Sequence, residues 1–319
     1  MLAFGPVPSR RLGRSLGINN IPPKTCSYSC IYCQLGRTTQ HIIKRKSFYK
    51  PAEIFREVKR KVNEAISRNE KIDYLTFVPD GEPTLDVNLG REISLLRQIG
   101  IPVAVLTNSS LIWREDVKED LLKANLVSLK IDAATEALWR KINRPCKGLS
   151  LDRILDGIAD FAEAFKGTLI TETMLIDEIK YDDELRKIAV FLRELNGLEK
   201  AYVAIPTRPP AEKWVKPAKE ETVNLAYQIF SEKLGTEKVE YLIGYEGNAF
   251  ASTGKVKEDL LAITAVHPMR REAVRELLRK ANAEWRVIEE LLHKNLLVEV
   301  KYEGDLYYMR RLPSRTSGY

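Results

Sequence analysis

The chain lacks the features that mark several large classes of protein. No apolar run approaches the about 18 residues that a membrane-spanning helix needs, so no membrane segment is expected. The first residues lack a charged stretch followed by an apolar run, which argues against a signal peptide. Only four cysteines occur, and three of them fall within eight residues, so a disulfide scaffold is excluded. We therefore expect a cytoplasmic protein in a reducing compartment.

Acidic residues are missing from the first fifty positions, which hold nine lysines and arginines. The net charge of +7 is therefore uneven: residues 1–50 contribute +9, residues 51–254 contribute −5 and residues 255–319 contribute +3. This concentration favours an anionic partner such as nucleic acid or a phosphorylated metabolite, although a solvated basic surface would give the same composition. Glutamine is also scarce beside abundant lysine, arginine and glutamate, which is typical of a thermophile.

Between residues 51 and 244 the sequence alternates helix-like and strand-like patterns. With an earlier strand near residues 15–21, the pattern predicts about six βα units. Such alternation is typical of an α/β fold with a parallel sheet, either open or curled into a partial barrel. Chemistry in these folds gathers at the carboxyl ends of the strands. The expected strands are 15–21, 73–79, 102–108, 126–132, 168–176, 200–206 and 239–244, and the expected helices are 51–66, 89–99, 114–124, 151–165, 182–195 and 220–234.

The pattern changes after residue 244. Residues 245–256 are rich in Gly, Asn and Ser and predict a linker between a core of residues 1–244 and a small domain of residues 257–319. Three short helices (257–266, 270–281 and 284–294) and a hairpin (296–310) predict a winged helix-turn-helix. Its recognition helix carries Glu289 and Glu290, while Lys301, Arg310, Arg311 and Arg315 lie on the wing and tail. Both nucleic-acid binding and a protein-contact or lid role therefore stay open.

The segment Cys26-Ser-Tyr-Ser-Cys30-Ile-Tyr-Cys33 carries the clearest chemical signal. Three thiolates at this spacing can bind three irons of a [4Fe–4S] cluster and leave the fourth iron free for a small chelating molecule. A zinc site with His41 as the fourth ligand and three unrelated buried cysteines are the alternatives. The cluster is favoured because the motif follows a predicted strand and precedes the βα array.

With Tyr32 before its last cysteine, this segment resembles the CxxxCxφC motif of the radical S-adenosylmethionine (SAM) superfamily. The resemblance covers roughly residues 10–245 and implies a partial (βα)6 barrel. Gly81 and Glu82 resemble the family's GGE motif, which holds the SAM amino group, although Asp80 replaces the first glycine. Thr107 and Asn108 are similar to the family's turn near the ligand.

The fourth predicted strand also matches the family. Alternation places Ser128, Lys130 and Asp132 on one face, and this stretch is similar to the motif that reaches the SAM carboxylate and ribose. Further cofactor-binding positions implied by the resemblance are Glu172, on the same face of its strand as Met174, and Ile205 and Pro206, which match the position that packs on adenine.

The resemblance implies a radical mechanism. Cys26, Cys30 and Cys33 hold the cluster, and the open iron binds the amino and carboxylate groups of SAM. An electron from a reducing donor then cleaves the S–C5′ bond, and the resulting 5′-deoxyadenosyl radical abstracts hydrogen from the substrate. The protein is therefore expected to be an iron–sulfur oxidoreductase or transferase-like enzyme whose residues place SAM and substrate.

The substrate is less directly indicated. The flanking sequence resembles the branch that contains wyosine synthase, which remodels a guanine in tRNA, but no cysteine precedes Cys26 and Cys146 alone cannot hold a second cluster. We therefore expect a sister group that modifies RNA. Arg10, Arg11 and Arg14 could clamp phosphates, but packing on acidic helices or offsetting the charge of the cluster would explain them equally well. The alternatives are an enzyme acting on a peptide or protein, including a glycyl-radical activase, and an iron–sulfur regulator that binds DNA.

Overall fold

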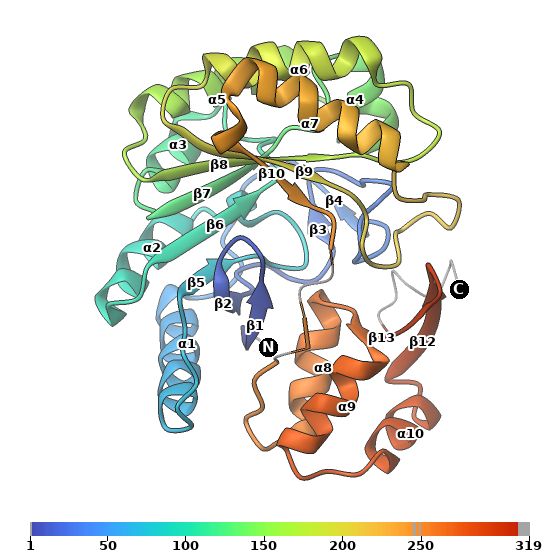
Figure 1. Cartoon of the computed structure of the whole chain (residues 1–319). Helices are drawn as coiled ribbons and strands as arrows, with labels where there is room; N and C mark the ends of the chain where they lie inside the picture. The colour runs from blue at the N-terminus through green and yellow to red at the C-terminus, as the bar shows by residue number, and fades with distance from the viewer. Residues whose placement is uncertain (1, 245–246, 249, 312–319) are drawn as a thin grey trace.

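An eight-stranded sheet forms the centre of the computed structural model, which describes residues 2–244, 247–248 and 250–311 (Figure 1). The strands follow the order β1-β2-β5-β6-β7-β8-β9-β10, and every neighbouring pair is parallel except β1 and β2. Because the sheet order follows the chain order, each strand lies beside the next, as in a barrel that has not closed. The strands are β1 (Ala3–Ser9), β2 (Gly13–Ile18), β5 (Tyr74–Phe77), β6 (Val103–Thr107), β7 (Leu126–Lys130), β8 (Thr168–Met174), β9 (Leu198–Ala204) and β10 (Val239–Leu242).

Helices connect the parallel strands, and α5, α6 and α7 cover the side of the sheet away from the C-terminal elements (Figure 1). Amphipathic sequence explains this packing; in α1, for example, Ile54, Val58 and Val62 are buried against the sheet. The predicted α/β fold with six βα units is confirmed. The helices are α1 (Pro51–Ile66), α2 (Leu89–Leu96), α3 (Glu115–Leu121), α4 (Glu136–Asn143), α5 (Leu151–Ala164), α6 (Asp182–Glu194) and α7 (Glu220–Leu234), with 3-10 turns η1 (Pro83–Leu85), η2 (Arg97–Ile99) and η3 (Thr236–Lys238).

Two elements near the site were not predicted. Strand β1 contains Gly5, Pro6 and Pro8, which disfavour a strand interior, but it lies at the sheet edge, where proline needs no ladder partner. Helix α4 is only eight residues long and buries Trp139, Ile142 and Asn143. The loop between β2 and α1 also holds a short pair of strands, β3 (Thr25–Cys26) and β4 (Gln40–His41).

The C-terminal part has the element order α8 (Val256–Val266), β11 (Met269–Arg270), α9 (Arg271–Lys280), α10 (Arg286–His293), β12 (Leu297–Tyr302) and β13 (Asp305–Arg310). The three helices and the hairpin lie where they were predicted, and β11 adds a third strand in the order β11-β13-β12. The assignment of this part as a winged helix domain stays a prediction. Arg315, placed on its tail by the sequence, lies outside the described residues.

The described part of the predicted linker packs against the core. Phe250 is fully buried in an apolar cluster with Phe4 of β1 and Leu260 of α8, and the amide of Ala251 donates to the carbonyl of Pro6 at 3.1 Å. The guanidinium of Arg68 contacts the Ser252 and Thr253 carbonyls. The C-terminal elements are therefore anchored to the β1–β2 hairpin, and the division into a core, a linker and a small domain stays a prediction. Among the described residues, no helix is long and apolar enough to cross a membrane.

Candidate active site

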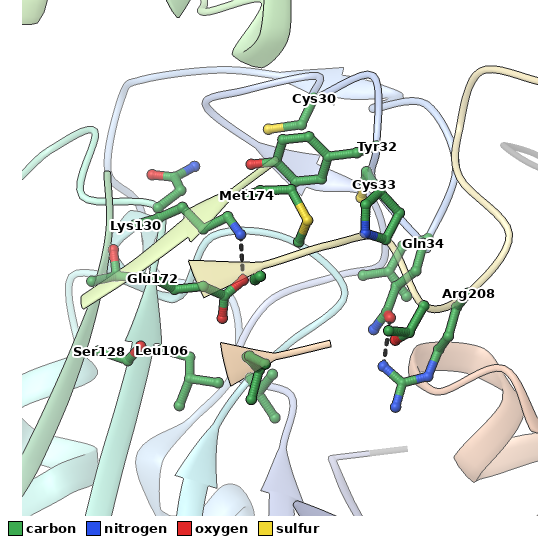
Figure 2. A pocket seen from close by; sticks show the side chains of 18 of the residues that line it. Cys30, Tyr32, Cys33, Gln34, Leu106, Ser128, Lys130, Glu172, Met174 and Arg208 are labelled. Carbon is green, nitrogen blue, oxygen red and sulfur yellow. Dashed lines mark hydrogen bonds and ion pairs between the residues drawn. The ribbon is translucent and has the colours of Figure 1, made fainter. Parts of the chain in front are cut away.

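A cavity of about 290 Å³ opens at the carboxyl ends of the parallel strands (Figure 2). Most residues singled out in the sequence line it, although they come from separate loops and strands. Asp132 and Arg14 are absent from its lining. The predicted residues that line it are Arg10, Arg11, Cys26, Cys30, Tyr32, Cys33, Gly81, Glu82, Thr107, Asn108, Ser128, Lys130, Glu172, Ile205 and Pro206.

Each of the three cysteines of the β2–α1 loop has a side-chain nitrogen donor near its sulfur, and Cys26 also accepts the Tyr28 amide at 3.4 Å. The Nδ2 of Asn108 lies 3.5 Å from Sγ of Cys26. The Nδ2 of Asn143 lies 3.5 Å from Sγ of Cys30. The Nζ of Lys24, a buried lysine, lies 3.7 Å from Sγ of Cys33 and 2.6 Å from the Gly36 carbonyl. Each sulfur therefore has a donor placed to stabilise negative charge on it.

The surroundings of the thiols suit a metal cluster. Burial, together with the neighbouring Cys33, raises the pKa of Cys30 to about 12, and burial with Cys30 also raises the pKa of Cys26. Three adjacent thiolates would repel one another here, so they need the positive charge that iron supplies. No group of three or more His, Cys, Asp or Glu side chains among the described residues could hold a single metal ion. The Nε2 of His41, the fourth ligand of the zinc alternative, lies 3.0 Å from the Ser27 carbonyl.

Glu82 joins the loops that follow β5 and β6. Its Oε1 accepts hydrogen bonds from the hydroxyls of Thr84 and Thr107, each at 2.6 Å, and its Oε2 accepts the Asn108 amide at 2.7 Å. Burial raises the pKa of this carboxyl, and these hydrogen bonds offset part of the rise. The Glu82 side chain therefore holds Asn108 against Cys26. Gly81 lies so close to the cysteine loop that a Cβ there would be 1.9 Å from the Thr25 carbonyl oxygen.

Lys130, Glu172 and Arg11 form a charged group across β7, β8 and the β1–β2 turn. The Nζ of Lys130 lies 2.5 Å from Oε1 of Glu172, and Arg11 pairs with the other carboxylate oxygen. Burial alone would raise the pKa of Glu172, but Lys130 and Arg11 outweigh it and hold the pKa at about 2. The Nζ of Lys130 also lies 4.9 Å from the ring centre of Tyr32, so the group extends to the cysteine loop.

Asp132 acts behind the cavity wall. Its carboxylate accepts hydrogen bonds from the Tyr32 hydroxyl and from Nδ2 of Asn143, the latter at 2.7 Å, and from the Met174 amide at 2.9 Å. Asp132 therefore positions Tyr32 from behind the cavity lining, and its expected contact with SAM stays a prediction. Asn143, which also contacts Cys30, was missed in the sequence because the helix that carries it, α4, was missed.

The basic residues of the first segment divide into two groups. Arg10 and Arg11 line the cavity, whereas Arg14, near the start of β2, pairs with Glu70 outside the cavity lining. Arg37 and Arg45 also pair with carboxylates of the middle segment: Arg37 with Glu212, and Arg45 with Asp116 and Asp120. Part of the +9 segment therefore complements the acidic middle segment. Arg14 lies apart from the cavity that Arg10 and Arg11 line, and a phosphate contact of these arginines stays a prediction.

The C-terminal elements reach the rim of the cavity. The hydroxyls of Tyr302 and Tyr307 donate to the carbonyls of Pro206 and Thr207, at 3.2 and 2.9 Å. Arg208 also lines the cavity. Its Nη1 lies 2.8 Å from Oε1 of Gln34, the contact drawn in Figure 2, and its Nη2 lies 2.9 Å from Nε2 of His267. No motif pointed to Gln34 or Arg208, because their contacts depend on how the C-terminal part packs.

Cys146 lies outside the cavity lining. Its amide donates to the Ser27 carbonyl at 2.9 Å, and its thiol lies 3.6 Å from the His41 carbonyl. Its backbone therefore helps to fix the cysteine loop.

Comparison with known proteins agrees with this geometry. Residues 20–192 match the family model of the radical SAM superfamily. The chain belongs to the radical SAM superfamily.

A UPF0026 protein of Methanocaldococcus jannaschii is 51% identical over 315 residues, covering 98% of this chain and 97% of that protein. The structure is similar in fold to TYW1 with a lysine–pyruvate adduct bound (17% identity, 69% of this chain and 73% of that chain, TM-score 0.53). It is also similar in fold to a radical SAM methyltransferase from Sphaerobacter thermophilus, with 14% identity and a TM-score of 0.51. That match covers 71% of this chain and 66% of the methyltransferase chain.

Superfamily membership identifies an enzyme that uses a [4Fe–4S] cluster and SAM. The residues present fit both groups. Cys26, Cys30 and Cys33 share one cavity wall and would hold the cluster. The remaining cavity is bounded by polar groups on β7 and β8 and by Ile205 and Pro206 after β9, which suits a ligand with both charged and aromatic parts.

Proposed function

We propose that this radical SAM enzyme modifies RNA in the cytoplasm, with tRNA as the first substrate to test. The observation that carries the proposal is a row of arginines on α9. Arg271, Arg275 and Arg279 follow one another at single-turn spacing and, with Trp285, line an open groove. The guanidinium carbons of Arg271 and Arg275 lie 5.4 and 5.9 Å from the centre of the Trp285 ring.

The charge of this arginine row is not balanced locally. No carboxylate within the described part of the chain forms an ion pair with any of the three arginines. Like charges at this spacing destabilise a helix, so an external anion would relieve the repulsion. Guanidinium groups beside a partly exposed aromatic ring match the phosphates and bases of RNA, because arginine pairs with phosphate and the ring can stack on a base.

The same part of the chain supports the cavity rim. Helix α9 packs on β13, and Tyr307 of β13 donates to the Thr207 carbonyl beside Pro206. RNA bound at α9 would therefore be held by the part of the protein that borders the cavity. This arrangement fits a large RNA substrate that places a single nucleotide in the cavity. The winged helix assignment belongs to this proposal.

The chain's own residues have separable roles in the proposed reaction. When bound, the cluster and SAM supply a carbon radical that abstracts hydrogen. The three cysteines would hold the cluster, and Glu82 holds the Asn108 amide beside it. The Lys130–Glu172 ion pair places two opposite charges side by side in the cavity lining. The apolar rim residues Leu35 and Val78 help to exclude water from the reacting atoms.

The proposal predicts salt-dependent binding of tRNA through α9. Replacing Arg271, Arg275 and Arg279 together by alanine should weaken binding at least about tenfold and flatten the salt dependence, because about three phosphate contacts are lost. Fluorescence anisotropy with labelled bulk tRNA over a range of NaCl concentrations measures both effects.

A matched control removes the same charge from another exposed helix. The triple alanine variant at Arg186, Lys187 and Arg193 of α6 should bind tRNA as the wild type does. Equal weakening in both variants would show binding by net charge alone and contradict a site at α9. Absence of wild-type binding at low salt would turn attention to the peptide- or protein-directed alternative.

A further inference from the structure

A basic surface borders the cysteine loop outside the cavity lining. Arg37 and Arg144 pair with the same carboxylate, that of the buried Glu212, at 2.9 and 2.5 Å. None of these three residues lines the cavity. Burial would raise the pKa of Glu212, but hydrogen bonds from the two arginines outweigh it and lower the pKa. Glu212 therefore stays ionised and holds both guanidinium groups beside the loop.

This surface carries more positive than negative charge. Arg37 and Arg144 share one carboxylate, and their side chains are 59% and 43% exposed. Lys141 and Lys147 lie three residues before and after Arg144 and are exposed as well. No carboxylate in the described ranges forms an ion pair with either lysine. We refer to Arg37, Lys141, Arg144 and Lys147 together as the basic face.

Very little protein separates the basic face from two of the cysteines. The Nδ2 of Asn143, the residue before Arg144, lies 3.5 Å from Sγ of Cys30. Arg37 directly follows a turn that is closed by a 3.1 Å hydrogen bond to the Cys33 carbonyl. One exposed arginine is therefore joined to the residue that contacts Cys30, and the other lies four residues after Cys33.

Reductive cleavage of SAM needs an electron from outside the protein. In the loaded enzyme, SAM and the substrate occupy the cavity, so a protein that delivers the electron must approach the cluster from another side. The basic face meets this requirement, because it lies outside the cavity lining and next to the residues that flank Cys30 and Cys33.

We infer that the basic face docks an acidic one-electron carrier protein with a flavin or iron–sulfur group near its surface. Complementary charge steers such a partner onto the site and speeds association. The indole of Trp214, which is 47% exposed and two residues after Glu212, adds an aromatic contact of the kind enriched in interfaces. The carrier is oxidised by one electron and the cluster is reduced by one, and no bond or proton is exchanged. The inference rests on superfamily chemistry and is independent of RNA as the substrate.

The test uses a purified acidic flavodoxin, reduced to its hydroquinone and mixed anaerobically with the cluster-reconstituted, SAM-loaded enzyme. The absorbance of flavodoxin semiquinone measures electron transfer independently of any product. We expect the second-order rate of the wild type to fall as the NaCl concentration rises. In Lys141→Gln/Lys147→Gln, the low-salt rate should fall at least about fivefold and depend less on salt, because half of the steering charge is lost. Arg144→Gln, in which Arg37 keeps Glu212 paired, should also lower the rate.

Two controls separate docking from other effects. Arg56→Gln/Lys59→Gln removes two exposed charges from α1, which Figure 1 shows well apart from β3 and β4 of the cysteine loop, and it should react as the wild type does. Reduced methyl viologen, a small cation that needs no docking surface, should reduce Lys141→Gln/Lys147→Gln at least as fast as the wild type. Iron content and thermal unfolding check that each variant is loaded and folded.

A rate loss confined to flavodoxin, with tRNA binding at α9 unchanged, supports the docking site. The inference is overturned if flavodoxin does not react with the wild type, or reacts equally fast with Lys141→Gln/Lys147→Gln. Equal slowing in the α1 control would show an effect of net charge alone, and equal slowing with methyl viologen would show damage at the cluster; either result also overturns it. Weaker tRNA binding by Lys141→Gln/Lys147→Gln, with normal electron transfer, would assign the face to RNA instead.

Discussion

At the scale of single residues, the donors around the cysteines are the feature that sequence inspection could least foresee. Asn108, Asn143 and Lys24 come from three separate segments, and each contacts one sulfur. Asn108 was singled out because the resemblance included it, whereas Lys24 and Asn143 belong to no motif. Their spatial convergence, and not their residue type, gives them a role in the site.

We expect Lys24→Met and Asn143→Ala each to lower the reduction potential of the cluster. Removing a positive charge or a donor next to sulfur destabilises the more negative, reduced state, by an amount on the order of tens of millivolts. Potentiometric titration followed by electron paramagnetic resonance measures the shift. Lys44→Met removes an exposed lysine of the same loop and should leave the potential unchanged; an equal shift there would contradict a local effect.

Gly81→Ala should prevent normal packing of the cysteine loop. The added Cβ would meet the Thr25 carbonyl oxygen at 1.9 Å, and a backbone atom cannot move aside without displacing Cys26. We expect a loss of about 1–3 kcal/mol in the free energy of unfolding and less iron bound per chain. Gly244→Ala, at a position with no heavy atom within 4 Å, is the control. Normal iron content in Gly81→Ala would show that the loop tolerates the shift.

At the scale of elements, the strands and helices of the core could be predicted because their periodicity is strong and their order follows the chain. Strand β1 and helix α4 could not, because prolines obscured the first and its short length obscured the second. Both matter for function: β1 carries the turn that places Arg10 and Arg11, and α4 carries Asn143. The small polar residues of the predicted linker also gave no indication that Phe250 among them is buried in an apolar cluster.

Phe250→Ala tests the anchoring of the C-terminal elements. Phe250 is fully buried with residues of β1 and α8, so its truncation should cost about 3–5 kcal/mol of the free energy of unfolding. Denaturant unfolding followed by tryptophan fluorescence measures this loss. Ile66→Ala removes an apolar side chain that is 63% exposed and should change stability by less than about 0.5 kcal/mol. A Phe250→Ala value as small as that of the control would mean that the segment does not hold the two parts together.

At the scale of the whole molecule, the uneven charge has two separate explanations. Arg14, Arg37 and Arg45 of the basic first segment pair with acidic residues of the middle segment, so they stabilise the fold. Arg11 of the same segment pairs with Glu172 inside the cavity, and the arginines that we propose for RNA binding lie outside this segment, on α9. The sequence provides only the net charge of each segment. This quantity cannot distinguish arginines that stabilise the fold from arginines that bind a partner, because ion pairs form between residues far apart in the chain.

The C-terminal part connects these two basic regions. It is held to the core by Phe250 and by the contacts of Tyr302, Tyr307 and His267 with the cavity rim, and it carries the arginine row of α9. The family model ends at residue 192 and says nothing about this arrangement. The chemistry of the enzyme could therefore be predicted from the cysteine motif, whereas its substrate depends on how the remaining parts are assembled.

The measurement that tests the account most directly is the yield of 5′-deoxyadenosine. The protein is reconstituted with iron and sulfide under anaerobic conditions, reduced by an electron donor, and supplied with SAM, with and without bulk tRNA. We expect 5′-deoxyadenosine from the wild type, a yield that rises with tRNA, and none from Cys30→Ala. A fully loaded wild type that yields no 5′-deoxyadenosine under either condition would contradict the radical mechanism, and a yield indifferent to tRNA would contradict RNA as the substrate.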